Sequence, residues 1–187
     1  MDQRDEAERI IREHLLWSVG AGLVPVPLVD LAAVTGIQLD MLKQLCRLYG
    51  VDYSISSGKA WVSALTGSLL ARFGANALKL IPGIGTLLGG ASMAVMAGAS
   101  TYAIGNVAVK HFEAGGSFAD FDPERARADY ETAFEEGKTY AGDLARNRRK
   151  TRDAFEKLEK LGALKEKGII TEAEFEAKKK QLLETIA

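Results

Sequence analysis

The feature that most restricts how this chain can fold is a long stretch without charge. From Leu80 to Val109 there is no Asp, Glu, Lys or Arg over 30 residues, whereas charged residues are dense from Phe121 onward. Within this stretch, residues 86–109 are compatible with one helix of about 36 Å, at about 1.5 Å per residue. The hydrocarbon core of a bilayer is about 30 Å thick, so we expect residues 86–109 to be able to cross a membrane.

Small residues recur at every fourth position within this uncharged stretch. A helix that lacks bulk on one face lets another backbone approach closely, and dispersion contacts can then hold the helices together even in lipid. In water each interior Gly costs about 1 kcal/mol relative to Ala, so we expect these residues to have a packing role. A buried core helix of a soluble bundle would show the same pattern, and both interpretations stay open. The residues that we expect to pack helices here are Gly85, Gly89, Gly90, Ala94, Gly98 and Gly105.

The preceding residues also predict helices, and no segment shows the alternation typical of a strand. Pro25-Val26-Pro27 predicts a break between helices at residues 15–24 and 28–49, because Pro lacks a backbone donor and disfavours helix in the residue before it. Gly50 is a plausible end for the second helix. Asp30 lies inside apolar sequence, and we favour a helix-capping role for it over a functional intramembrane acid. A short apolar helix is expected at residues 61–73.

The C-terminal third predicts one long charged helix and one short helix. Asp122-Pro123 is typical of a helix start and Gly168 of a helix end. Apolar or small residues recur at three, four or seven positions along the long helix, which suggests one apolar edge and a coiled coil as one option. Thr171 and Glu174 form a capping-box pattern for the final helix. The recurring residues include Tyr130, Phe134, Gly137, Ala141, Leu144, Phe155 and Leu158.

Five cations lie within seven residues of the long helix. Such a run can attract anionic lipid headgroups at about 1 kcal/mol per cation, although a charge run is more often solvated helix surface. No base-stacking aromatic residue lies nearby and the net charge of the chain is −1, so we expect no nucleic-acid partner. The candidate headgroup ligands are Arg146, Arg148, Arg149, Lys150 and Arg152.

Signals for catalysis, cofactors and metals are poor. Gly83-Ile84-Gly85 lacks the third glycine of a dinucleotide fingerprint and follows no strand, and no phosphate-binding loop sequence occurs. His14 and His111 have no partner at metal-ligand spacing, and Cys46, the single cysteine, has no nearby base. We therefore expect no enzymatic activity, no catalytic residues, no cofactor and no metal.

Two stretches resemble a known family. One runs from Val24-Pro25-Val26-Pro27 to Tyr49-Gly50, and the other contains Ile81-Pro82-Gly83-Ile84-Gly85, Gly89-Gly90 and Thr101-Tyr102-Ala103-Ile104-Gly105. Together they resemble the YcjF-like, GTPase-associated bacterial domains of unknown function, over residues 8–116. The resemblance implies a membrane protein that works beside a small GTPase. This chain has no GTPase domain, so a GTPase would have to be a separate partner.

The C-terminal residues resemble a SHOCT domain, over residues 154–187. The resemblance lies in Phe155–Leu161, Leu164–Phe175 and Lys178–Leu183, and it implies a short helical hairpin that promotes oligomerisation. About 34 residues cannot bury much surface alone, so the apolar positions need another surface, most simply another copy of the chain. The oligomerisation residues that we expect are Phe155, Leu158, Leu161, Ile170, Phe175 and Leu182.

These patterns predict an all-α chain, with Gly-rich apolar helical hairpins followed by a long charged helix and a short C-terminal helical hairpin. The expected parts are an apolar domain at residues 1–116, a charged helical linker at 117–153 and a SHOCT-like hairpin at 154–187. The expected function is a membrane-associated, self-oligomerising scaffold without catalytic activity. We expect it at the bacterial inner membrane with its C-terminal tail in the cytoplasm. The alternatives are a soluble cytoplasmic homo-oligomer (shell, filament or GTPase adaptor) and a pore-forming or membrane-remodelling protein.

Overall fold

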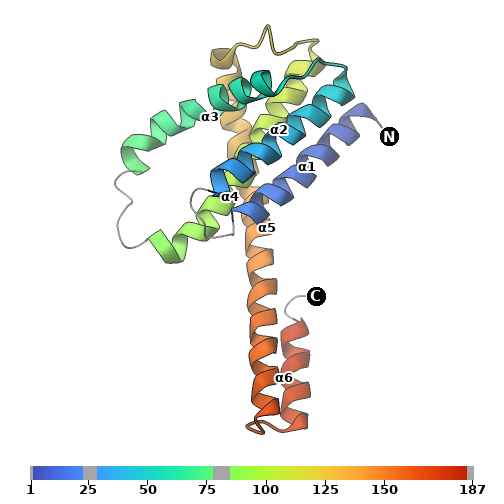
Figure 1. Cartoon of the computed structure of the whole chain (residues 1–187), viewed down its shortest axis with the longest axis vertical. Coiled ribbons are helices and arrows are strands. Elements are labelled where there is room, and N and C mark those ends of the chain that lie inside the picture. Colours follow the sequence, from blue (N-terminus) through green and yellow to red (C-terminus); the bar gives the residue numbers. More distant parts are fainter. Residues whose placement is uncertain (1, 23–28, 78–84, 185–187) are drawn as a thin grey trace. The chain divides into compact units, whose positions relative to one another are not determined.

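The described part of the chain forms six helices and no strand, which confirms the all-α prediction (Figure 1). The computed structural model describes the backbone of residues 2–22, 29–77 and 85–184, and the side chains of residues 2–22, 32–67 and 93–184. The helices are α1 (Gln3–Ala21), α2 (Val29–Tyr49), α3 (Ile55–Ala77), α4 (Gly85–Glu113), α5 (Pro123–Glu166) and α6 (Glu172–Glu184).

The chain divides into two compact units. Unit 1 comprises residues 1–142 and contains α1 to α4 with the first part of α5. Unit 2 comprises residues 143–187 and contains the rest of α5 with α6. The residues expected to form a charged linker, 117–153, therefore fall partly in each unit, and Tyr130 and Phe134 are buried in the core of unit 1.

Glycines in the left-handed backbone region end three of the helices. Gly50, Gly115 and Gly168 have φ angles of 70°, 80° and 67°, which a residue without Cβ adopts at little cost. After Gly168, the N–H of Ile169 donates to the carbonyl of Leu164 at 3.0 Å, so a carbonyl of the last helical turn is satisfied. The predicted helix ends at Gly50 and Gly168 are confirmed.

Helix α3 begins six residues before the predicted start at residue 61. Ser54 caps it, because its hydroxyl accepts a hydrogen bond from the backbone N–H of Ser57 at 3.1 Å. The first turn of α3 is mostly polar, so the apolar pattern that predicted this helix did not include it. The helix also continues through Gly74 to Ala77, although we expected Gly74 to break it.

Helix α4 lies at the centre of unit 1, and its contacts fix the direction of its neighbours. It runs antiparallel to α1, since α1 meets it at Gly22 and Ala94, and again at Ile11 and Gly105. It runs parallel to α2, because Gln38 of α2 bonds to Thr101 of α4 and Tyr49 bonds to Glu113 further along both helices. The first part of α5 is antiparallel to α4, as pairs Lys110–Asp129 and Gly98–Ala141 show.

Side chains from all five helices of unit 1 build its core. Leu42, Leu45, Ile104 and Tyr130 are among its fully buried members. At one end Trp61 of α3 stacks on Phe112 of α4, with ring centroids 5.6 Å apart. Burying such large rings contributes strongly to stability, so this cluster anchors α3 to the end of α4.

The prediction of a membrane span at residues 86–109 is not confirmed. Among the residues that the structure describes, no helix combines the length and the hydropathy that crossing a bilayer requires. From Ala94 to Phe112, most residues of α4 are instead buried and pack against other helices of the same unit, whereas Met96 and Lys110 are exposed. A helix that is apolar around most of its circumference is typical of such a central position.

Unit 2 is a helical hairpin in which α6 lies beside the last part of α5 (Figure 1). Thr171 and Glu174 form the predicted capping box: the carboxylate of Glu174 accepts from the backbone N–H and the hydroxyl of Thr171, both at 2.8 Å. Lys165 of α5 pairs with Glu172 of α6 at 2.8 Å and lies 4.6 Å from the centre of the Phe175 ring. No residue of α6 is buried.

Candidate functional site

Close packing at small residues occurs inside unit 1. A Cβ added to Gly98 would lie 2.6 Å from Val19 Cγ2 of α1 and 2.8 Å from Ala141 Cβ of α5. A Cβ on Gly105 would lie 2.6 Å from Ile11 Cγ1. Gly98 therefore marks the point where three helices meet, and the ladder of small residues serves helix packing within one chain at these positions.

The remaining ladder residues are placed as follows. Ala94 is fully buried, and Gly22 of α1 packs against its backbone at a distance that leaves no room for a Cβ. Gly85, Gly89 and Gly90 belong to the first turns of α4, but their surroundings lie outside the described side chains. Assembly of several copies through this ladder stays a prediction.

A buried hydrogen-bond network links four helices at the level of Thr101. Its hydroxyl lies 2.7 Å from the hydroxyl of Ser18 and accepts from the side-chain amide of Gln38 at 3.3 Å. Ser100 in turn lies 3.1 Å from the hydroxyl of Tyr130, and burial raises the pKa of Tyr130 to about 12. Because these polar groups find partners only in one alignment of the helices, the network fixes their register.

His14 forms a second polar connection, between α1 and α2. Its side chain is fully buried, with Nδ1 2.7 Å from the carbonyl oxygen of Ile10 and Nε2 3.1 Å from the carboxylate of Asp40. Gln44 also donates to Asp40 at 2.8 Å. The hydrogen bond from His14 is the largest cause that lowers the pKa of Asp40, since it favours the ionised carboxyl.

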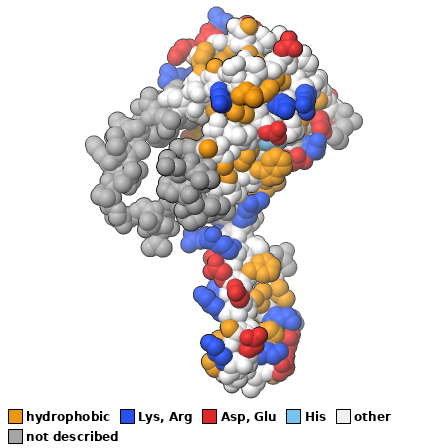
Figure 2. Space-filling model, in the orientation of Figure 1, with side chains coloured by type: hydrophobic (Ala, Val, Ile, Leu, Met, Phe, Trp, Pro, Cys, Tyr) orange, Lys and Arg blue, Asp and Glu red, His pale blue; other side chains and the backbone are white. Residues whose placement is uncertain are grey.

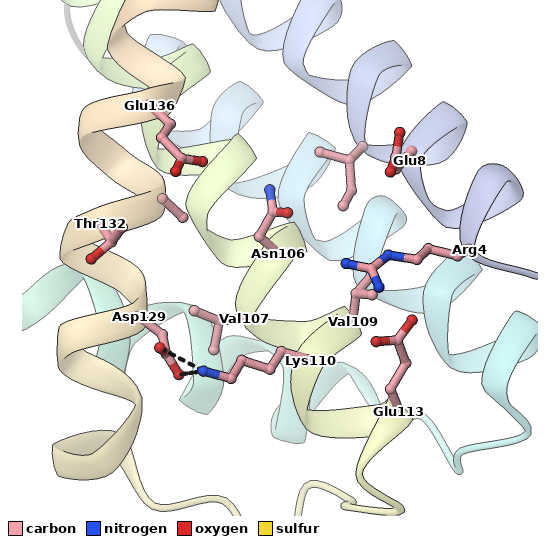
Figure 3. A pocket seen from close by; sticks show the side chains of 12 residues that line it. Arg4, Glu8, Asn106, Val107, Val109, Lys110, Glu113, Asp129, Thr132 and Glu136 are labelled. Atoms are coloured by element: carbon pink, nitrogen blue, oxygen red, sulfur yellow. Dashed lines mark hydrogen bonds and ion pairs between the residues drawn. The ribbon is translucent and has the colours of Figure 1, made fainter.

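A cleft of about 410 Å³ opens between α1, α4 and α5 (Figure 3). Lys110 donates to both carboxylate oxygens of Asp129 across it, each at 2.7 Å. Arg4, Glu113 and Glu136 also line the cleft, as labelled in Figure 3. Its lining therefore mixes both signs of charge, which suits a polar or charged ligand but favours no single class.

The hydroxyl of Thr132, which lines this cleft, donates to the carbonyl oxygen of Ala128 at 2.9 Å. The described side chains contain no group of three or more His, Cys, Asp or Glu residues that could hold a metal ion. Cys46 is buried, and burial raises the pKa of its thiol to about 11, so the unreactive thiol form dominates near neutral pH.

The hairpin of unit 2 exposes apolar side chains between its charges (Figure 2). Of the predicted oligomerisation residues, Phe155 is exposed, and Leu158, Leu161, Ile170, Phe175 and Leu182 are half-buried. Three further apolar residues of the hairpin are exposed, although they were not among the predicted oligomerisation residues. These are Leu164, Ile169 and Leu183.

All five members of the basic run are exposed. Arg146, Arg149 and Arg152 lie 3.4 to 4.0 Å from carboxylates of the same helix, one turn away. Such exposed pairs contribute little to stability, so these cations are available to an external anion.

Comparison with known proteins agrees with this division of the chain. The model of a family described as a domain of unknown function (DUF697) matches residues 1–136, which cover most of unit 1. The chain belongs to the DUF697 family. The YcjF-like resemblance is consistent with this assignment. The model of the short C-terminal domain, SHOCT, matches residues 156–183 within unit 2, as predicted.

One relative of this DUF697 protein is magnetosome membrane protein 22 of Magnetospirillum gryphiswaldense. The two sequences are 44% identical over 144 residues, which cover 74% of this chain and 73% of the relative. No solved structure matches the chain. The relative's name connects one family member with a membrane, and no catalytic family is indicated.

Several residues that organise this DUF697 unit were not anticipated from the sequence. Ser18, Gln38 and Thr101 were read as parts of apolar helices, although a polar residue flanked by apolar ones at the buried face is a signal for an internal hydrogen bond. The pairing of Asp40 with His14 joins residues 26 positions apart. Only the folded chain brings such pairs together.

Proposed function

We propose that this protein is a non-catalytic, membrane-associated adaptor that self-associates through its C-terminal hairpin. Unit 1 supplies the helical body that meets the membrane, and unit 2 connects copies of the chain. The observation that carries the proposal is the hairpin: α6 has no buried residue, yet the hairpin bears a series of apolar side chains.

The self-association part rests on the exposure of the hairpin. Phe155 and Ile169 have exposed fractions of 58% and 64%, and fully burying one such side chain contributes about 1.5–3 kcal/mol. Two helices cannot cover these residues themselves, because a small unit has too little interior. A second hairpin offers the same apolar residues and charges of both signs, so copies of the chain are a fitting cover.

The membrane part has two supports. A relative 44% identical over most of both chains is named a membrane protein. The sequence of unit 1 also contains no acidic residue from 53 to 112, so no carboxylate of this stretch would repel anionic headgroups. A GTPase partner, which the YcjF-like resemblance implies, stays a prediction.

Sedimentation velocity of the full-length protein tests self-association. Ile169→Ser should weaken it about tenfold or more, since about 1.4 kcal/mol corresponds to a factor of ten. Ile55→Ser is the matched control: Ile55 has the same exposed fraction, 64%, but lies in unit 1. A wild-type chain that stays monomeric at all concentrations, or equal losses in both variants, would contradict the proposal.

Fractionation of cells tests the membrane part. The wild-type protein should sediment with membranes and be released by detergent. Recovery of the full-length chain in the supernatant, as a discrete large particle without lipid, would support the soluble oligomer instead. Dye leakage from vesicles would support the pore-forming alternative.

A further inference from the structure

Charge is distributed unevenly along the helices of unit 1. Because α1 is antiparallel and α2 parallel to α4, residues 15–22, 32–39 and 93–104 lie in the same half of the unit. These three segments contain no Asp, Glu, Lys or Arg, and we call them the charge-free half. The continuation of the same three helices, which we call the charged half, carries many charges, among them Arg9, Arg47 and Lys110.

Helix α5 provides the charged margin of this half. It reaches the level of Gly98 at Ala141, and one turn earlier Lys138 pairs with Glu135. The pair of buried His14 and exposed Asp40 lies at the boundary towards the charged half. The described residues of α1, α2 and α4 in this half thus form a surface without charge, bordered by charged groups, which is the pattern of a surface facing an apolar phase.

Most of the exposed large apolar residues described in unit 1 lie in the charge-free half or beside it on α5. Trp17 and Met93 have exposed fractions of 51% and 50%, and Met96 is 37% exposed. Tyr140 of α5 is 58% exposed and lies at the same level, since its ring centre is 5.5 Å from that of Tyr102. Among the described residues of unit 1, Ile55 of α3 is the exposed large apolar side chain that lies outside this region.

The depth of this set fits a membrane interface. Met93 and Thr101, whose hydroxyl lies 2.7 Å from that of Ser18 beside Trp17, are eight positions apart along α4, or about 12 Å at about 1.5 Å per residue. Elements that lie in the headgroup region bury their apolar face by about 5–10 Å. Trp and Tyr are enriched at this depth, because each combines an apolar ring with a polar group that stays hydrated.

We infer that the charge-free half of unit 1 docks into the headgroup region of a lipid bilayer, with Trp17, Met93 and Met96 as its inserted side chains and Tyr140 of α5 beside them. This inference rests on the membrane association proposed above and names the face that makes the contact. A lipid surface fits this half, because its exposed large side chains are apolar and its three segments contain no charge. The docking is shallow, and the charged half remains in water.

Vesicle co-sedimentation of the full-length protein tests the face. Vesicles of phosphatidylcholine, alone or mixed with phosphatidylglycerol, should bind the wild type. Trp17→Glu and Met93→Glu should each reduce partitioning about tenfold, whereas Ile55→Glu should bind like the wild type. Far-ultraviolet circular dichroism confirms that each variant is folded.

Fluorescence gives a second measurement that needs no charged variant. Trp17 lies in the charge-free half, whereas Trp61 is buried with only 3% exposed. Brominated phosphatidylcholine in the mixed vesicles should quench the wild type strongly and Trp17→Phe weakly. This readout decides the question if Trp17→Glu does not fold.

The outcomes separate the inference from the proposed function. A wild type that ignores all vesicles overturns the membrane association itself. A wild type that binds while Trp17→Glu and Met93→Glu bind equally well, and without quenching of Trp17, overturns the docking face alone. Loss of self-association instead of vesicle binding in these variants would assign the face to a subunit contact and overturn the inference as well.

Discussion

Two glycines of α5 illustrate how much depends on single residues. A Cβ at Gly137 would lie 2.9 Å from the Cα of Ala99 and 3.0 Å from Tyr102 Cβ, so α5 and α4 approach closely there. A Cβ at Gly142 would meet nothing within 4 Å. The two positions belong to the same helix and differ mainly in this contact.

Alanine at these positions should therefore have opposite effects. Gly142→Ala should raise the free energy of unfolding by up to about 1 kcal/mol, because Ala is the better helix former. Gly137→Ala should lower it by about 1–2 kcal/mol, because overpacking outweighs that gain. Urea unfolding, followed by circular dichroism, measures both. Equal stabilisation by the two variants would contradict the close approach of α4 and α5.

The pair of His14 and Asp40 makes a pH-dependent prediction. The pKa of Asp40 is lowered from 3.8 in the folded protein, so its contribution to stability is complete above about pH 4 and is lost as the pH falls through the folded pKa. Asp40→Asn should flatten the fall in unfolding free energy between about pH 4 and pH 2. Asp52→Asn, at an exposed loop position, is the control. An unchanged acid profile in Asp40→Asn would exclude a contribution from this pair.

At the scale of elements, the basic run of α5 can be tested against other cations of the same helix. Arg148→Gln combined with Lys150→Gln should weaken binding to anionic vesicles about tenfold or more, since each cation near a charged surface contributes about 1 kcal/mol. Lys157→Gln with Lys160→Gln removes two exposed cations outside the run. Equal losses in both double variants at the same salt concentration would show that the run has no special role.

Helix ends were the most predictable elements, because their signals are local. Gly50, Gly168 and the capping box at Thr171 depend on residues within one turn. The partner of α5 was not predictable in this way. Its apolar edge was found correctly, but a coiled coil was considered, whereas Tyr130 and Phe134 are buried in the core of unit 1. Periodicity shows that one face of a helix is buried, but it does not show which other element covers that face.

The candidate surfaces also differ in whether they depend on local sequence or on the packing of distant segments. The apolar residues of the hairpin and the uncharged stretch of α4 were visible in the sequence, since both depend on composition. The charge-free half was not, because it requires knowing that residues 15–22 run antiparallel to residues 93–104. The buried network at Thr101 likewise joins residues up to 83 positions apart.

At the scale of the whole molecule, the division into two units predicts separable behaviour. Residues 1–142 alone should fold cooperatively, because the core and its aromatic cluster lie within unit 1. This fragment should not self-associate through a hairpin that it lacks. Thermal unfolding and sedimentation velocity measure the two properties. A fragment that is unfolded, or that assembles like the full chain, would contradict the separation of the units.

The antiparallel packing of α1 on α4 also affects the chain while the ribosome is making it. Ile11 meets Gly105, which is translated about 90 residues later. At a synthesis rate of about 5–20 residues per second, the apolar side of α1 stays uncovered for roughly 5–20 s, until the α4 residues that pack against it have been made. During this interval the nascent chain presents uncovered Ile11, Leu15 and Val19 to its surroundings. Helix α1 is therefore an early site for chaperone or lipid capture, before the mature core hides it.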